Sequence, residues 1–172
     1  MRKSFFVNIS IIFMILVAAK SFGASTESEN SQANRDERHI STQYFDITIP
    51  EGWSLLSPLK TVSTGLIAFF GNKVENLAVS IGVRKNNADL NKIARQTIMS
   101  LKKDGMDCGD LIEQGGLYRL NVSGKVNGVM FFGSKDGITS ITSIMGTNIN
   151  LANMLLASIK TNYPGLFPTK ID

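Results

Sequence analysis

Hydrophobic and polar positions alternate along the first half of the folded part of this chain. Phe45, Ile47 and Ile49 are separated by polar or amphipathic residues until Pro50, as expected for a half-buried strand. A short apolar run at 66–70 is closed by Gly-Asn, and four apolar positions then recur at period two over 77–83. These two segments predict a hairpin of two further strands.

The period changes to that of a helix after Asn87, which we expect to be the N-cap. The pattern predicts a helix over 88–103 that stops at Gly105 and lies on the sheet. Its inner positions are Leu90, Ile93, Ala94, Thr97, Ile98 and Leu101. Its outer positions are Asp89, Lys92, Arg95, Gln96 and Lys102, a basic face that is more typical of plain solubility than of binding.

Strand signals return from Asp110 to Met145, where Gly-Gly, Asn-Gly and Asp-Gly pairs separate the apolar runs. The connections are too short for parallel crossovers, so we expect an antiparallel meander of about four strands. A second helix is expected over 151–160, ending before Pro164.

The order of these elements predicts an α+β fold, with an antiparallel sheet of about six to seven strands and two main helices packed on it. We expect a signal peptide at 1–24, a disordered polar tether at 25–41, one domain at 42–163 and a frayed tail at 164–172.

The N-terminal segment has the three parts of a signal peptide: basic Arg2 and Lys3, an apolar stretch over 5–19, and small residues. The apolar stretch is shorter than the ~20 residues of a membrane-spanning helix, although an uncleaved anchor is the alternative. Cleavage after Ala19, Ser21 or Gly23 satisfies the small-x-small rule, and the mature chain is expected to begin between Lys20 and Ala24. We expect a periplasmic or secreted protein with no stable membrane anchor after processing.

The whole chain has a net charge of +4, but three of its 18 basic residues lie in this N-terminal segment. The rest of the chain carries 15 basic and 14 acidic residues. A nearly neutral mature chain argues against binding to nucleic acid. The single cysteine, Cys108, has no intrachain partner for a disulfide, and its acidic neighbours are expected to raise its pKa.

The chain offers little catalytic chemistry. Its one histidine, His39, falls in the expected tether, which removes histidine-assisted nucleophiles and histidine-based metal sites from the domain. Asp104, Asp107, Asp110 and Glu113 recur every third residue, without the alternate-residue spacing of a calcium loop. We therefore expect no catalytic residue, no metal, no cofactor and no enzymatic activity.

The opening Phe-Asp-Ile-Thr-Ile-Pro-Glu-Gly-Trp at 45–53, the central helix, the meander and the closing helix resemble the PsbP-like superfamily. In element order the chain is most similar to its bacterial envelope member DcrB, but it lacks a cysteine for lipidation after the signal. The resemblance implies an α/β/α sandwich and the role of an adaptor or binding subunit. Trp53 is expected in the core rather than as a ligand platform.

We therefore expect a non-catalytic interaction protein of the cell envelope or periplasm that binds a protein partner. The alternatives are a periplasmic immunity protein that neutralises a secreted toxin and a carrier of a small ligand. The partner is expected at Leu55, Leu56 and Leu59, in a loop whose apolar spacing fits neither helix nor strand. The other interpretation of this loop is that it folds back over the end of the sheet.

Overall fold

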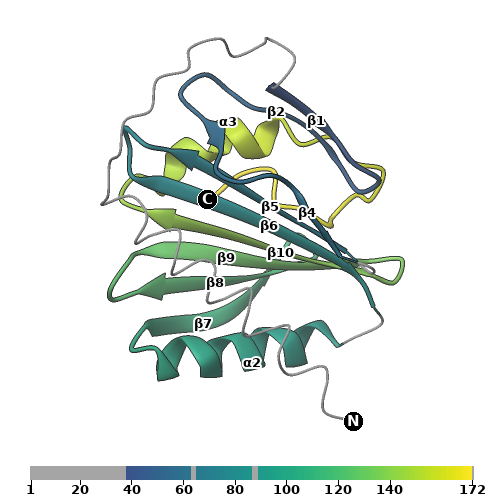
Figure 1. Cartoon of the computed structure of the whole chain (residues 1–172). Coiled ribbons are helices and arrows are strands. Elements are labelled where there is room, and N and C mark those ends of the chain that lie inside the picture. Colours follow the sequence, from purple (N-terminus) through teal and green to yellow (C-terminus); the bar gives the residue numbers. More distant parts are fainter. Residues whose placement is uncertain (1–37, 63–64, 87–88, 172) are drawn as a thin grey trace.

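The structure, a computed structural model, describes residues 38–62, 65–86 and 89–171. These residues form an eight-stranded antiparallel sheet, a separate two-stranded sheet and two α-helices (Figure 1). The predicted α+β class is confirmed, with a slightly larger sheet than expected. The predicted signal peptide at 1–24 and most of the predicted tether lie outside the described residues. None of the described helices is long and apolar enough to cross a membrane.

The large sheet is built mainly from hairpins, as the sequence predicts. Its long strands are β5 (Gly65–Asn72), β6 (Leu77–Lys85), β7 (Asp107–Gln114), β8 (Leu117–Ser123), β9 (Gly128–Lys135) and β10 (Ile138–Gly146). The order is β3-β5-β6-β10-β9-β8-β7, where β3 is the short strand Ser54–Leu55, and the short strand β4 (Lys60–Val62) also pairs with β5. The meander is confirmed and begins slightly earlier than expected. Both central residues of its Gly115-Gly116 and Asp136-Gly137 turns have positive φ, which gives these hairpins the twist that two-residue turns require.

The segment before β5 differs from the prediction at several points. β1 (His39–Ser41) pairs with β2 (Asp46–Thr48) in the separate sheet, so the first predicted strand does not join the main sheet. Ile40 is buried, and the prediction of a disordered tether is therefore wrong for its last residues. The expected loop after Trp53 contains two short strands, β3 (Ser54–Leu55) and β4 (Lys60–Val62).

The first described helix, α2 (Leu90–Lys103), occupies the predicted place with a different N-terminal cap. The Asp89 carboxylate accepts hydrogen bonds from the backbone N–H groups of Asn91 (2.9 Å) and Lys92 (3.4 Å), so Asp89 is the cap instead of Asn87. At the other end Gly105 has φ +77°, and the N–H of Met106 donates to the carbonyl of Leu101 (3.0 Å). Both ends of the helix are therefore fixed by local hydrogen bonds.

The closing helix is shorter than predicted. A 3₁₀ turn, η2 (Ile149–Leu151), leads into α3 (Ala152–Ala157), which ends before the expected limit at residue 160. The chain then returns to β2, where Asp46 and Lys160 exchange two backbone hydrogen bonds of 2.8 Å. This pairing makes the extended conformation at Lys160 more favourable than a further turn of helix.

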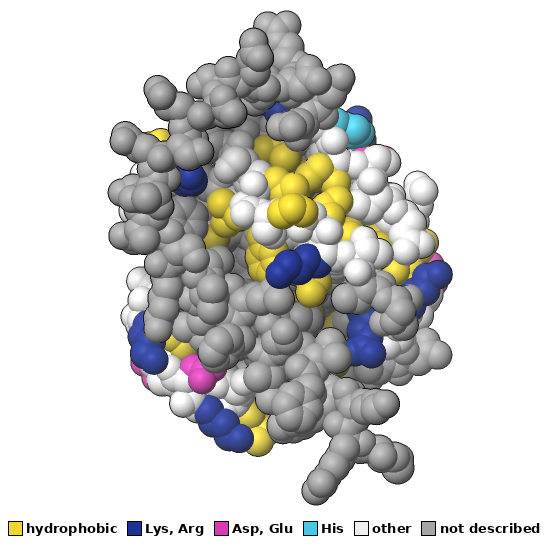
Figure 2. All heavy atoms as spheres, viewed as in Figure 1, with side chains coloured by type: hydrophobic (Ala, Val, Ile, Leu, Met, Phe, Trp, Pro, Cys, Tyr) yellow, Lys and Arg dark blue, Asp and Glu magenta, His cyan; other side chains and the backbone are white. Residues whose placement is uncertain are grey.

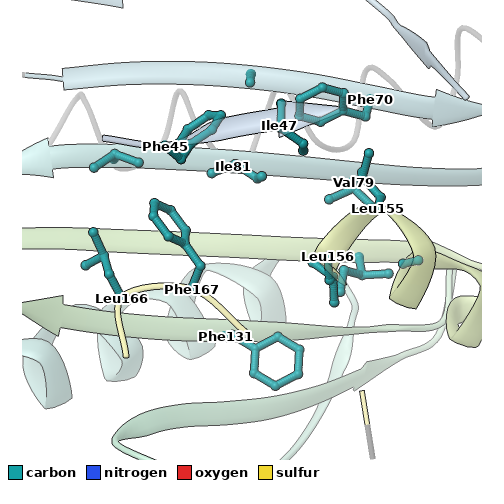
Figure 3. Packing of buried hydrophobic residues seen from close by; sticks show 14 of the residues in the cluster. Phe45, Ile47, Phe70, Val79, Ile81, Phe131, Leu155, Leu156, Leu166 and Phe167 are labelled. Atoms are coloured by element: carbon teal, nitrogen blue, oxygen red, sulfur yellow. The ribbon is translucent and has the colours of Figure 1, made fainter. Parts of the chain in front are cut away.

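Buried side chains on the two faces of the large sheet form two hydrophobic clusters. Along β9, Val129 and Phe131 belong to the first cluster and Met130 and Phe132 to the second, as strand alternation requires. The first cluster lies beneath α3, β2 and the C-terminal tail (Figure 3), and it includes Trp53, so the core assignment of Trp53 is confirmed. The second contains the inner face of α2. Helices on opposite faces give the predicted α/β/α arrangement.

The C-terminal tail is part of this core, and the prediction that it frays is wrong. Leu166, Phe167 and Ile171 are buried in the first cluster, where the rings of Phe167 and Phe45 meet edge to face with centroids 5.5 Å apart. Asn153 of α3 accepts a hydrogen bond from the N–H of Ile171 (2.6 Å). The ordered domain therefore extends beyond the expected 42–163 at both ends.

Candidate functional site

The predicted partner-binding segment lies at one edge of the large sheet. Ser54 and Leu55 of β3 pair with Gly71 and Phe70 of β5, and the N–H of Leu56 donates to the carbonyl of Phe69 (2.8 Å). Pro58 follows before β4 pairs with the first half of β5. The edge is therefore made of two very short strands separated by a proline, which offers little unpaired backbone for another strand to join.

The structure does not bring the three predicted leucines together. Leu55 and Leu59 are half-buried and pack against the first cluster. Leu56, also half-buried, lines a recess with Phe69, Ser80, Ser143 and Met145. Phe69, Ser143 and Met145 alternate along their strands with residues of the first cluster, so Leu56 lies on the opposite face of the sheet. Leu55 and Leu59 thus partly fold back over the sheet, and Leu56 is left apart from them.

Leu56 owes its position to a glycine. A Cβ added at Gly71 would lie 2.6 Å from Cδ2 of Leu56, so with any other residue here the leucine side chain would have to shift from its present place on the sheet. The sequence shows a Gly-Asn pair closing the strand, which reads as a turn signal. The structure places Gly71 inside β5, where it accommodates a neighbouring side chain instead.

The recess beside Leu56 is shallow and mostly apolar. Its enclosed volume is about 10 Å³, which is room for roughly one water molecule. Pockets for drug-sized ligands usually enclose ~300–1,000 Å³, so this recess does not favour the alternative of a small-ligand carrier. The hydroxyl of Ser143, a residue only 1% exposed, has no hydrogen-bond partner in the described part of the chain. The hydroxyl oxygen is itself enclosed, so it offers no surface contact.

The opposite edge of the sheet is β7, an irregular strand that carries several charged side chains. β7 is largely exposed, carries Asp107, Asp110 and Glu113, and shifts register between Cys108 and Leu111. Bulges and charges on an edge strand prevent edge-to-edge pairing with other chains. Three of the four acidic residues that recur every third position therefore lie on this exposed edge strand.

Cys108 is a partly buried thiol on β7 that packs against the second cluster. Burial raises its pKa above the ordinary value, Lys102 acts in the opposite direction, and Asp107 raises it further. The expected direction is confirmed, although burial contributes more than the acidic neighbour. A raised thiol pKa lowers the thiolate fraction, so Cys108 is poorly suited to act as a nucleophile.

His39 lies in β1 rather than in a tether, and its side chain is exposed. Across 38–62, 65–86 and 89–171, no three His, Cys, Asp or Glu side chains gather closely enough to hold a metal ion. The candidate site among the described residues is therefore the surface recess and its rim.

Comparison with known proteins adds little to this geometry. The sequence matches no model of a known protein family and no curated protein. Among solved structures, the chain is similar to the solution structure of cyanobacterial PsbP (CyanoP) from Synechocystis sp. PCC 6803, with a TM-score of 0.47 and 11% sequence identity. The alignment covers 78% of this chain and 98% of the cyanobacterial one. This likeness shows nothing about function.

Proposed function

We propose that this chain is an exported, non-catalytic protein of the cell envelope or periplasm that binds a protein partner. Export is supported by the order of basic, apolar and small residues over 1–24. The likeness to DcrB in element order is part of the same proposal, without the lipid anchor.

The observation that carries the proposal is the recess on which Leu56 lies. Leu56 lies half-buried there on Phe69 and Met145, beside a sheet edge too short for strand addition. A partner that lays an apolar side chain over Leu56 would bury the exposed part of this leucine. Buried apolar anchors of this kind contribute most of the affinity in protein interfaces.

The test is affinity capture from an envelope extract of the source cell, with the exported chain as bait. Leu56→Ser is expected to reduce recovery of the partner at least ten-fold, because it removes the apolar anchor. The matched control is Ile112→Ser, which removes a side chain that is 51% exposed at the opposite edge of the sheet. Thermal midpoints of both variants show whether a loss of capture comes from unfolding.

Equal recovery by the two variants would contradict the role of Leu56. A double change of Leu56 and Leu59 to Ser is less suitable, because Leu59 packs against the first cluster and its loss is expected to lower stability. The intact mass of the recovered bait also tests export, since the proposal requires a chain that begins between Lys20 and Ala24. An immunity role would appear as capture of a toxin, and deletion of the gene would then harm cells only in the presence of that toxin.

A further inference from the structure

All four charged residues of α2 are basic. The helix reads LNKIARQTIMSLKK, with Lys92, Arg95, Lys102 and Lys103 and no Asp or Glu. At 3.6 residues per turn these four side chains fall on one side of the helix, and Met99 falls in the middle of the same side. We name this set of five residues the α2 stripe.

The α2 stripe faces away from the protein. The inner side of the helix buries Ile93, Ala94, Thr97 and Leu101, whereas every member of the stripe is exposed and Met99 is 63% exposed. Figure 1 shows α2 along the outer limit of the molecule beyond β7, opposite α3. In the same view, Figure 2 shows Lys and Arg side chains on that lower edge. The stripe is therefore accessible along the whole helix, ~21 Å for 14 residues.

Acidic residues lie at the two ends of α2 and along the neighbouring strand β7, whereas the helix itself carries none. Asp89 accepts the N-terminal cap hydrogen bonds, while Asp104 and Asp107 follow the C-terminus. Lys125 adds a further cation beside that end, where its Nζ donates to the carbonyl of Asp104 (2.7 Å). Four of the 15 basic residues that follow residue 24 thus lie on one helix that carries no acidic residue.

We propose that the α2 stripe adsorbs reversibly to the surface of a bilayer that contains anionic phospholipids. Three of its four cations are lysines, and protein interfaces are enriched in arginine and depleted in lysine. Lysine side chains suit a diffuse layer of phosphate headgroups, which needs no fixed geometry. The fourth cation, Arg95, has a fixed position instead, because its Nε donates a hydrogen bond to Oδ1 of Asn91 (2.6 Å).

The structure also limits the depth of this contact. The apolar side of α2 is buried in the second cluster. It is therefore not available to insert into lipid, as the apolar side of an interfacial helix does. Binding is then electrostatic, with Met99 as the one apolar side chain at the contact. Such adsorption is reversible and weakens as salt shortens the Debye length, and it does not require a membrane anchor. It is independent of the proposed partner site at Leu56.

The test measures partition of the chain starting at Ser25 into vesicles of phosphatidylcholine, with and without roughly one third phosphatidylglycerol. This chain keeps every described residue of both clusters and lacks the apolar N-terminal stretch. Binding is expected only to the anionic vesicles at low salt and is expected to be lost at about 0.5 M salt. The variant Lys92→Ser, Lys102→Ser, Lys103→Ser should bind on the order of a hundred-fold more weakly, about five-fold for each lysine.

The matched control changes Lys73, Lys85 and Lys135 to Ser. These lysines are also exposed but lie outside α2, and their loss gives the same net charge. The control is expected to keep most of the vesicle binding. Vesicles should also protect Lys92, Lys102 and Lys103 from acetylation, while Lys73, Lys85 and Lys135 remain reactive.

Three outcomes would overturn the proposal. The first is an absence of binding to anionic vesicles, and the second is an equal loss of binding in the stripe variant and the control. The third is that the stripe variant binds vesicles normally but loses capture of an acidic protein, which would assign the stripe to a protein partner instead.

Discussion

Gly133 of β9 lies directly beneath the C-terminal tail. A Cβ at this position would lie 2.9 Å from the carbonyl carbon of Leu166 and 2.8 Å from Cδ2 of Leu117. The hydroxyl of Ser140, on the neighbouring strand, donates to the carbonyl of Leu166. The tail therefore approaches the sheet so closely that only a residue without a side chain fits below it.

Gly133→Ala is expected to destabilise the protein by about 1–3 kcal/mol, because the methyl group must displace the backbone of the tail. Thermal unfolding measures this as a fall of a few degrees for each kcal/mol. Gly109→Ala is the control, since its Cβ would meet no atom closer than 3.7 Å. If both variants melt together, the close approach of the tail is wrong.

At the scale of single elements, α2 is the clearest case in which local sequence and tertiary packing agree. Asp89 caps its N-terminus, and Gly105 permits the left-handed turn that ends it. The predicted inner positions Ile93, Ala94, Thr97 and Leu101 are buried. Ile98, which was expected to face the sheet, is only half-buried at the side of the second cluster.

Ile93→Asp should cost on the order of several kcal/mol, because it places an unpaired carboxylate in the second cluster, where Ile93 is 8% exposed. Lys92→Asp changes the neighbouring exposed position and should cost far less. Thermal or urea unfolding of the two variants gives the comparison. Equal midpoints would mean that the register of the helix is incorrect.

At the scale of the whole molecule, the first cluster joins the two ends of the described chain. Phe45 packs on Phe167, and the hydroxyl of Thr161 donates to the carbonyl of Tyr44 (2.8 Å). The N-terminal hairpin and the C-terminal tail therefore cover the same face of the sheet together. Contacts between segments so far apart in sequence form only when the domain has folded.

Removal of residues 164–172 is expected to unfold the domain or to lower its thermal midpoint by more than ten degrees. The deletion removes Leu166, Phe167 and Ile171, which are buried at 0%, 5% and 7% exposure, and uncovers the first cluster. Burial of such side chains contributes about 1.5–3 kcal/mol each. Circular dichroism during heating measures the change, and a midpoint equal to that of the full chain would show that the tail is dispensable.

The geometry of the candidate site comes from contacts between segments that are distant in the sequence. The sequence marks Leu55, Leu56 and Leu59 as apolar residues without a regular period. Their division between two faces follows from the register of β3 on β5, and the position of Leu56 follows from Gly71. Neither relation is visible in the segment itself. Ser143 and Met145, which complete the recess, come from a strand almost ninety residues further along the chain.

The sequence by itself determined the elements whose causes are local: the hairpins at Gly115-Gly116 and Asp136-Gly137, the amphipathic helix α2, and the α+β class. Turn residues and hydrophobic period act within a few residues, so they can be recognised without the fold. Only the tertiary structure decided that Ile40 and the tail are ordered, that β6 pairs with β10, and that α3 stops at Ala157. These segments carry weak local signals. Their conformations are stabilised by apolar surface and hydrogen-bonding groups that distant parts of the chain supply.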